Sequence, residues 1–188
     1  MSKEIKIKPL EFIRSEAGPK LPLFRAHLHT MRNPRNNYHT KRLVLESPDW
    51  VNVVAVTRTG KLLIIYQYRS GADEITAEIP GGIVDEGESS LTAAKRELQE
   101  ETGYTSQDWR YLGAVQPNPA IHKHLCHHWL ALNVAKSTEM ALDDGEDIQV
   151  ECLTIKEVQA EIASGRLRHA LVLSGLSRVL FLWPQLLP

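Results

Sequence analysis

The chain has 188 residues, 43% of them hydrophobic, which is enough for one domain with a full core and a shorter additional element. The formal net charge of −1 lacks the basic excess that binding to nucleic acid requires, so we expect no nucleic-acid partner. No apolar run approaches the roughly 18 residues of a membrane span, and the two cysteines form no CxxC motif, so we expect a cytoplasmic protein without a membrane partner.

Residues 1–40 precede the expected core and are too few for an independent domain. Ile5 and Ile7 alternate with lysines and predict a short strand, and Gly18-Pro19 predicts a loop after it. Asn33-Pro34 and the residues up to Thr40 predict a polar turn region. We therefore expect an N-terminal extension that is rich in strands.

The remainder, residues 41–188, predicts a sheet combined with helices. Strand patterns cover residues 41–46, 51–57, 62–68, 75–79, 111–116, 124–134 and 148–153. The run at 62–68 lacks alternation and should be buried on both faces. A capping box at Thr154 and Glu157 predicts a helix through residue 163, and a last helix follows over residues 169–182. The fold class is α/β, with a mixed sheet between helical layers.

A glycine-rich turn and a helix with many carboxylates lie in the middle of the chain. Ser89 or Ser90 can cap the first turn, and Gly103 suits the left-handed residue that ends a helix. Glu97 and Glu101 are i,i+4 neighbours and repel each other unless a cation lies near them. Carboxylate oxygens are the ligands that Mg²⁺ or Mn²⁺ prefers, although a solvated acidic face would explain two glutamates alone.

The order of the residues decides between these interpretations. The residues of the turn and the helix occur in the order Gly82, Glu88, Arg96-Glu97-Leu98, Glu100-Glu101, Gly103 and Tyr104. On these residues the chain resembles the Nudix hydrolases. The resemblance implies the Nudix fold and a metal-dependent pyrophosphohydrolase, with Mg²⁺ as cofactor and Mn²⁺ as the alternative. It also implies that residues 1–40 pair with a second subunit in a homodimer, and that residues 41–188 form the Nudix hydrolase domain.

The resemblance also implies the roles of individual residues. Glu97, Glu100 and Glu101 are the predicted metal ligands, together with the backbone carbonyl of Gly81. Arg96 would orient the glutamates by charge-assisted hydrogen bonds. Glu100 and Arg96 are thus also predicted to serve catalysis. Glu88 is predicted to tie the loop to the helix.

The resemblance to ADP-ribose-type enzymes also implies that the base that activates water lies outside the motif, on a loop before a late strand, which here is residues 143–148 at the end of the acidic loop of residues 137–147. Glu146 is the predicted base or additional metal ligand, and Asp144 is the alternative. A solvated loop without any catalytic role would also explain these acids.

Three further residues are predicted to contact substrate. Arg69 ends a buried strand, where it can bind a phosphate or lie on the surface without a role. Glu78 resembles the glutamate ahead of the family's paired glycines, and it either binds substrate or braces the loop. Pro119 lies at a distance after Gly103 that resembles the ADP-ribose pyrophosphatase subgroup.

The leading functional prediction is hydrolysis of ADP-ribose or a related nucleoside diphosphate sugar. The alternatives are a Nudix hydrolase of another nucleotide (a dinucleoside polyphosphate, capped RNA or coenzyme A) and a Nudix module that senses a nucleotide without cleaving it. The histidines and Cys126 within residues 122–128 suggest zinc, but no further Cys or His pair completes a set of four ligands. Trp129 is interpreted as a core residue and not as an adenine-stacking ring.

Overall fold

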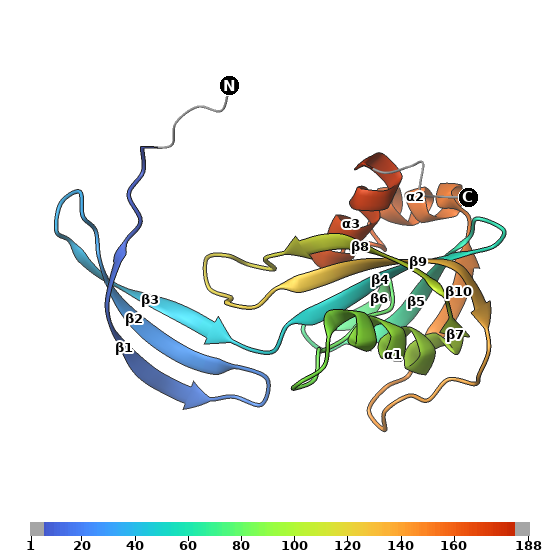
Figure 1. Ribbon diagram of the computed structural model, residues 1–188, viewed down its shortest axis with the longest axis horizontal. Helices are drawn as coiled ribbons and strands as arrows, with labels where there is room; N and C mark the ends of the chain where they lie inside the picture. The colour runs from blue at the N-terminus through green and yellow to red at the C-terminus, as the bar shows by residue number, and fades with distance from the viewer. Residues whose placement is uncertain (1–5, 183–188) are drawn as a thin grey trace. The chain divides into compact units, whose positions relative to one another are not determined.

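The structure is a computed structural model that describes residues 6–182, and the chain divides into two compact units (Figure 1). The first unit contains residues up to Ser47 together with residues 118–124. The second contains residues 48–117 and those from Leu125 onward. The two units are described separately.

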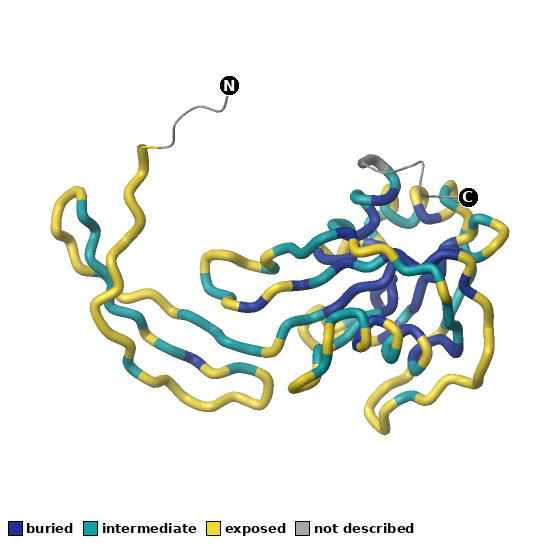
Figure 2. Tube along the Cα trace, viewed as in Figure 1, coloured by how far each residue is buried: buried dark blue, intermediate teal, exposed yellow. Residues whose placement is uncertain are grey.

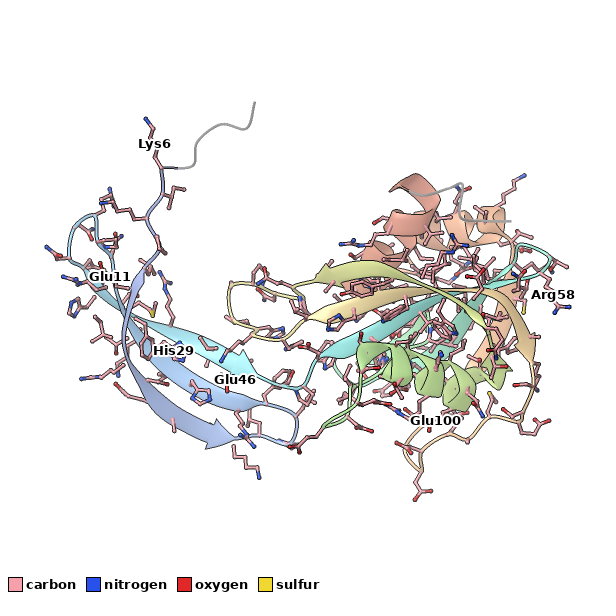
Figure 3. The ribbon with its side chains drawn as sticks, viewed as in Figure 1. Lys6, Glu11, His29, Glu46, Arg58 and Glu100 are labelled. Carbon is pink, nitrogen blue, oxygen red and sulfur yellow. The ribbon has the colours of Figure 1, made fainter. Side chains whose placement is uncertain are left out.

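The first unit is built on a three-stranded antiparallel sheet within the described residues. Its strands, in the order β1-β2-β3, are β1 (Glu11–Lys20), β2 (Arg25–Arg32) and β3 (His39–Glu46). Residues 118–124 run beside β3, where Leu45 donates its N–H to the carbonyl of Ile121 at 2.8 Å. Most residues of this sheet are exposed or half-buried, among them His29 and Glu46 (Figures 2 and 3).

Two predictions for this unit are wrong. Ile7 lies outside any strand, and Gly18-Pro19 lies inside β1 and not in a loop. Because β1 is an edge strand whose register shifts between Ala17 and Lys20, the missing N–H of Pro19 leaves no ladder hydrogen bond unmade. Ile5 lies outside the described residues. The expected division after residue 40 falls within β3, whereas the two units divide after Ser47.

The second unit contains a mixed sheet, as the sequence predicts. Its strands within the described residues are β4 (Trp50–Thr57), β5 (Leu62–Arg69), β6 (Glu74–Glu78), β7 (Tyr104–Thr105), β8 (Asp108–Val115), β9 (Cys126–Lys136) and β10 (Gln149–Leu153). The order is β10-β5-β4-β9-β7, with β6 paired to β5 and β8 paired to β9. The β4 and β9 strands are parallel and the other pairs are antiparallel.

Helices cover both faces of this sheet (Figure 1). On one face lies α1 (Ser90–Thr102), whose Ala93, Ala94 and Leu98 pack in one buried cluster with strand residues such as Val53. On the other face lie α2 (Ile155–Ser164) and α3 (Ala170–Ser177), which is followed by a π-helical turn at Arg178–Leu182. The predicted α/β class with a sheet between helices is confirmed.

The ends of α1 are fixed by local chemistry. Ser89 is the N-cap, and its hydroxyl accepts the N–H of Thr92. Gly103 ends the helix at φ 74°, and its carbonyl accepts the N–H groups of Ser137 and Thr138 at 2.9 and 3.1 Å. The C-terminus of α1 is therefore bonded to the start of the acidic loop.

Within the described residues, no helix combines the length and apolarity that would let it cross a bilayer.

Two glycines in similar backbone conformations, Gly103 and Gly165, allow a matched test of the contact between the end of α1 and the acidic loop. Gly165 ends α2 at φ 79° and has open space where a Cβ would lie, whereas a Cβ on Gly103 would lie 2.3 Å from the Thr138 carbonyl oxygen. We expect Gly165→Ala to lower the free energy of unfolding by about 1 kcal/mol through left-handed strain alone. Gly103→Ala should cost roughly 1–3 kcal/mol more because the loop must move. Urea denaturation of both variants measures the difference, and equal losses would contradict the contact.

Candidate active site

The glycine-rich turn before α1 runs so close to β4 that side chains cannot be accommodated. Val51 donates its N–H to the carbonyl of Gly82 at 2.9 Å. A Cβ on Gly81 would lie 2.2 Å from the Val51 carbonyl oxygen, and one on Gly82 would lie 2.3 Å from Oε1 of Glu97. The glycines thus allow the turn to lie between the sheet and the glutamates of α1.

Arg96 binds the carboxylates that surround it. Its guanidinium donates to Glu97 Oε1 at 2.8 Å, to Glu100 Oε2 at 3.1 Å and to both oxygens of Glu88 at 3.1–3.2 Å. It also donates to the carbonyl of Ile83 at 2.9 Å. Arg96 thus binds Glu97 and Glu100 by hydrogen bonds from one guanidinium. Glu88 links the turn to the helix, because it accepts from Arg96 and also from the N–H of Asp85.

Glu101 lies deeper than the other motif glutamates and is 3% exposed. Its Oε2 accepts the N–H of Gly81 at 2.8 Å. Burial raises the pKa of Glu101 to about 9, and the neighbouring Glu97 and Glu146 add to the rise. Burial also raises the pKa of Glu97, although Arg96 opposes that shift. A buried and a half-buried carboxylate, both with raised pKa values, are therefore adjacent on one face of α1.

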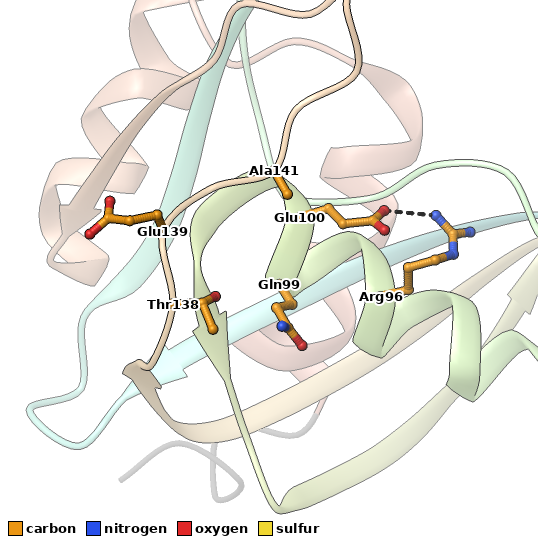
Figure 4. Close-up of a pocket in the computed structure, with 6 residues that line it drawn as sticks. All are labelled: Arg96, Gln99, Glu100, Thr138, Glu139 and Ala141. Carbon is orange, nitrogen blue, oxygen red and sulfur yellow. Dashed lines mark hydrogen bonds and ion pairs between the residues drawn. The ribbon is translucent and has the colours of Figure 1, made fainter.

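Glu100 lies on the outer side of α1 and is more exposed than its neighbours (Figure 3). It borders a hollow of about 420 Å³ between the helix and the acidic loop (Figure 4). The hollow is lined by Arg96, Gln99, Glu100, Thr138, Glu139 and Ala141. Its lining includes neither Glu97 nor Glu101, so it adjoins the glutamate cluster without containing it.

Arg69 and Glu78 form a bidentate ion pair, with Nε–Oε1 and Nη2–Oε2 distances of 2.8 Å each. Thr76 donates its hydroxyl to the same carboxylate at 2.6 Å. Burial alone would raise the pKa of Glu78, but the hydrogen bonds from Arg69 and Thr76 outweigh it and hold that pKa below its ordinary value. The two predicted substrate contacts therefore bind each other in the free protein.

The acidic loop brings Glu146 to the same region. The charge of Glu146 contributes to the raised pKa values of Glu97, Glu101 and Arg69, so the loop carries this charge to the same region. The loop is held by the Ala141 N–H, which donates to the carbonyl of Glu100 at 2.9 Å. Glu146 also accepts the N–H of Asp143.

Comparison with known proteins identifies the family that has this arrangement. The NUDIX domain family matches residues 48–173. The chain belongs to the Nudix family.

Relatives agree with this assignment. The chain is 31% identical to the methanol dehydrogenase activator of Bacillus methanolicus over 70% of this chain and 72% of that one. It is 32% identical to an ADP-ribose pyrophosphatase of Bacillus subtilis over 65% of this chain and 66% of that one. It is 25% identical to an ADP-ribose pyrophosphatase of Mycobacterium tuberculosis, with 90% and 82% covered.

A solved structure of an ADP compounds hydrolase superposes with a TM-score of 0.85 at 18% identity, covering 97% of this chain and 98% of that one. At this identity the likeness concerns the fold alone. The predicted Nudix fold and family membership are confirmed, and so is the enzyme class, a Nudix pyrophosphohydrolase.

Nudix hydrolases generally use divalent metal ions, and the donor set of this Nudix protein fits one. Glu97, Glu100 and Glu101 supply hard oxygen ligands, and a cation would relieve the charge of carboxylates that burial disfavours. In their present conformations, however, the side chains do not form a metal site: the described part of the chain has no group of three or more His, Cys, Asp or Glu that could hold an ion. The glutamates point toward Arg96 and the Gly81 N–H, so they must turn from these partners to bind an ion.

Other predicted residues lie elsewhere. Pro119 belongs to the first unit, so its place at the substrate mouth stays a prediction. His124 lies outside β9, which begins at Cys126, although the predicted strand begins at residue 124. His127 bonds Asp49 at 3.0 Å, and His128 is buried with Nε2 3.2 Å from the Ser174 hydroxyl. Trp129 packs against the core cluster under α1, as predicted.

Sequence reasoning missed two groups that organise this site. Thr76 was not singled out, although strand alternation places it on the same face as Glu78. The backbone N–H of Ala141 was also missed, and no side-chain pattern could have revealed it. Both act through hydrogen bonds to residues that the motif had already identified.

The ion pair should make stability depend on pH. Because the pKa of Glu78 is lowered in the folded state, the folded protein binds fewer protons than the unfolded chain near pH 4. The stabilisation is therefore complete above the ordinary pKa of 4.5 and is lost as pH falls below it. We expect Glu78→Gln to cost about 1–3 kcal/mol at pH 7, because Arg69 is partly exposed, and progressively less at lower pH.

Glu74→Gln is the matched control, since Glu74 lies on the same strand and pairs with the exposed Arg168. That substitution should cost no more than about 0.5 kcal/mol at any pH. Urea denaturation at neutral and acidic pH measures both variants. A cost of Glu78→Gln that stays constant with pH would show that the carboxylate charge does not contribute.

Proposed function

We propose that this Nudix protein hydrolyses the diphosphate bond of ADP-ribose or a related nucleoside diphosphate sugar, giving a nucleoside monophosphate and a sugar phosphate. The observation that carries the proposal is the set of motif carboxylates on α1, held by Arg96 and by the Gly81 N–H. Relatives named as ADP-ribose pyrophosphatases support the choice of substrate class.

A divalent ion, with Mg²⁺ proposed and Mn²⁺ as the alternative, supplies positive charge against the diphosphate oxygens when bound. Glu97, Glu100, Glu101 and the Gly81 carbonyl would hold it. Arg96 holds Glu97 and Glu100 close together on the helix, and these carboxylates would turn from the guanidinium to reach the ion. A helix is a rigid support for metal ligands, because its side chains keep fixed spacings.

The remaining residues act on water and substrate. Glu146 is proposed to accept the proton of the attacking water, because it is the acid on the loop whose charge raises the pKa values of both Glu97 and Glu101. Arg69 is proposed to bind a phosphate oxygen, since its side chain is 45% exposed and carries a forked donor set. Asp144 is the alternative base.

A nucleotide panel tests this function directly. Purified protein is incubated with ADP-ribose, GDP-mannose, ATP, a dinucleoside polyphosphate and coenzyme A, with Mg²⁺ and with excess EDTA, and phosphate is measured after coupling to a phosphatase. Turnover of the diphosphate sugars only with the metal supports the proposal. Preference for another nucleotide would move the substrate class, and binding without turnover would indicate a sensing module.

Two substitutions should separate metal binding from proton transfer. Glu101→Gln should weaken Mn²⁺ binding and lower kcat by about 10³-fold or more, because it removes an anionic ligand. Glu146→Gln should lower kcat by about 10²–10⁴-fold while Mn²⁺ affinity is preserved, as expected for a lost base. Calorimetry and steady-state kinetics measure both, with exposed Glu86→Gln as the control. An unchanged rate in Glu146→Gln would transfer the role to Asp144.

We also propose that residues 1–40 pair with a second copy of the chain in a cytoplasmic homodimer. Support comes from large apolar side chains that the first unit leaves exposed, including Phe12, Ile13, Tyr38 and Leu43. Light scattering tests the assembly, because a mass of 21.2 kDa in solution would exclude the dimer.

A further inference from the structure

One buried polar group beside the Arg69–Glu78 pair finds no partner among residues 6–182. Gln67 is 7% exposed, and within those residues nothing forms a hydrogen bond with its buried side-chain nitrogen. A buried amide donor left unpaired lowers stability, and native proteins contain few such groups. The position of Gln67 therefore calls for an acceptor that reaches it in another state of the protein.

The register of β5 and β6 identifies the groups near this amide. Gln67 lies opposite Thr76, and Arg69 lies opposite Glu74. Paired residues of neighbouring strands share a face, and so do residues two apart on one strand. Gln67, Arg69, Thr76 and Glu78 therefore share one face of this strand pair, and Glu78 is a diagonal neighbour of Gln67 within reach of a long side chain.

Arg69 does not bind the residue opposite it. Its guanidinium instead bonds Glu78, which lies opposite Ile65. The side chain must therefore run back along the strands and pass the level of Gln67 and Thr76. In this conformation Arg69 takes up the acceptor sites of Glu78 that face it, and Gln67 is left without a partner.

Arg69 and Glu78 differ in their freedom to move. Arg69 is 45% exposed, whereas the side chain of Glu78 is 3% exposed. If the arginine leaves for an external anion, the carboxylate stays buried with only Thr76 donating to it among the contacts it now makes. A buried charge that loses its partner is strongly destabilised unless another donor replaces it.

We propose that Gln67 is a positioning residue whose side-chain amide donates to Glu78 when Arg69 leaves that carboxylate for the diphosphate of a substrate. The kinetic part of this inference depends on the proposed function, because it needs Arg69 to bind an anionic substrate. The exchange lowers the cost of releasing Arg69, and it keeps Glu78 hydrogen-bonded in both states. Gln67 touches neither substrate nor metal.

Thermal unfolding tests the exchange without any activity measurement. Gln67→Met keeps the length of the side chain and removes the donor. In the wild-type background this change should leave Tm unchanged or raise it, since no hydrogen bond is lost. In an Arg69→Ala background, where the amide already bonds Glu78, it should lower Tm by about 2–4 °C.

Gln149→Met is the matched control, because Gln149 is exposed on the neighbouring β10 and bonds Glu151. Its effect on Tm should be the same in both backgrounds. An equal effect of Gln67→Met in both backgrounds would overturn the proposal, since the amide would then have a fixed partner, such as an ordered water, whatever Arg69 does.

Kinetics with ADP-ribose and Mg²⁺ give the second readout. Gln67→Met should raise KM by about tenfold and leave kcat within about twofold, because only the release of Arg69 becomes less favourable. A fall in kcat with unchanged KM would overturn the role in binding. If the wild-type protein cleaves no nucleotide, the proposed function fails, and the Tm comparison still decides whether Gln67 replaces Arg69 on Glu78.

Discussion

The structure depends on keeping several carboxylates close together on one helix. Like charges at i,i+4 positions destabilise a helix, and burial adds to the cost of ionising Glu97 and Glu101. Arg96 offsets part of that cost because its planar guanidinium reaches three carboxylates and a carbonyl at once. Glu101 is not among the partners of Arg96, and burial raises its pKa against the opposing hydrogen bond from the Gly81 N–H, so it keeps its proton readily. The carboxylates thus lie close together before any cation binds, and Glu97, Glu100 and Glu101 must turn from their present partners to reach one.

The same helix also positions what lies outside it. Its N-terminus follows a turn that fits against β4 only because Gly81 and Gly82 have no side chains. Its C-terminus accepts backbone N–H groups of residues 137, 138 and 141, and so fixes the start of the loop that carries Glu146. The connection at the C-terminus is made by backbone atoms, whereas Glu101 and Arg96 of α1 bind the turn through their side chains. A single rigid element therefore sets the distances between the predicted ligands and the predicted base, which a set of independent loops could not do as accurately.

The sequence correctly predicted the features that depend on the spacing of residues close together along the chain. Ser89 and Gly103 cap α1, the capping box at Thr154 opens α2, and the strands of the second unit lie close to their predicted ranges. Failures concern features that depend on which strands become neighbours. Gly18-Pro19 suggests a loop until β1 is known to be an edge strand. Likewise, the ion pair of Arg69 and Glu78 was not predicted, because it depends on the pairing of β5 with β6, which is a long-range property that a local pattern does not contain.

That register also explains how one strand serves both the core and the site. The residues of β5 from Leu62 to Ile65 are fully buried, as the uninterrupted apolar run predicts, and they pack under helices on both faces. Farther along, β6 pairs with the strand, and the same face changes from Leu63 and Ile65 to Gln67 and Arg69. Polar side chains at these positions are stable only if each finds a partner across the pair. The face holds the partly exposed Arg69, the buried carboxylate of Glu78 and the amide of Gln67, for which the described residues supply no partner while Arg69 stays on Glu78. A strand pair with more donors than its present arrangement uses is suited to exchange partners when an anion arrives.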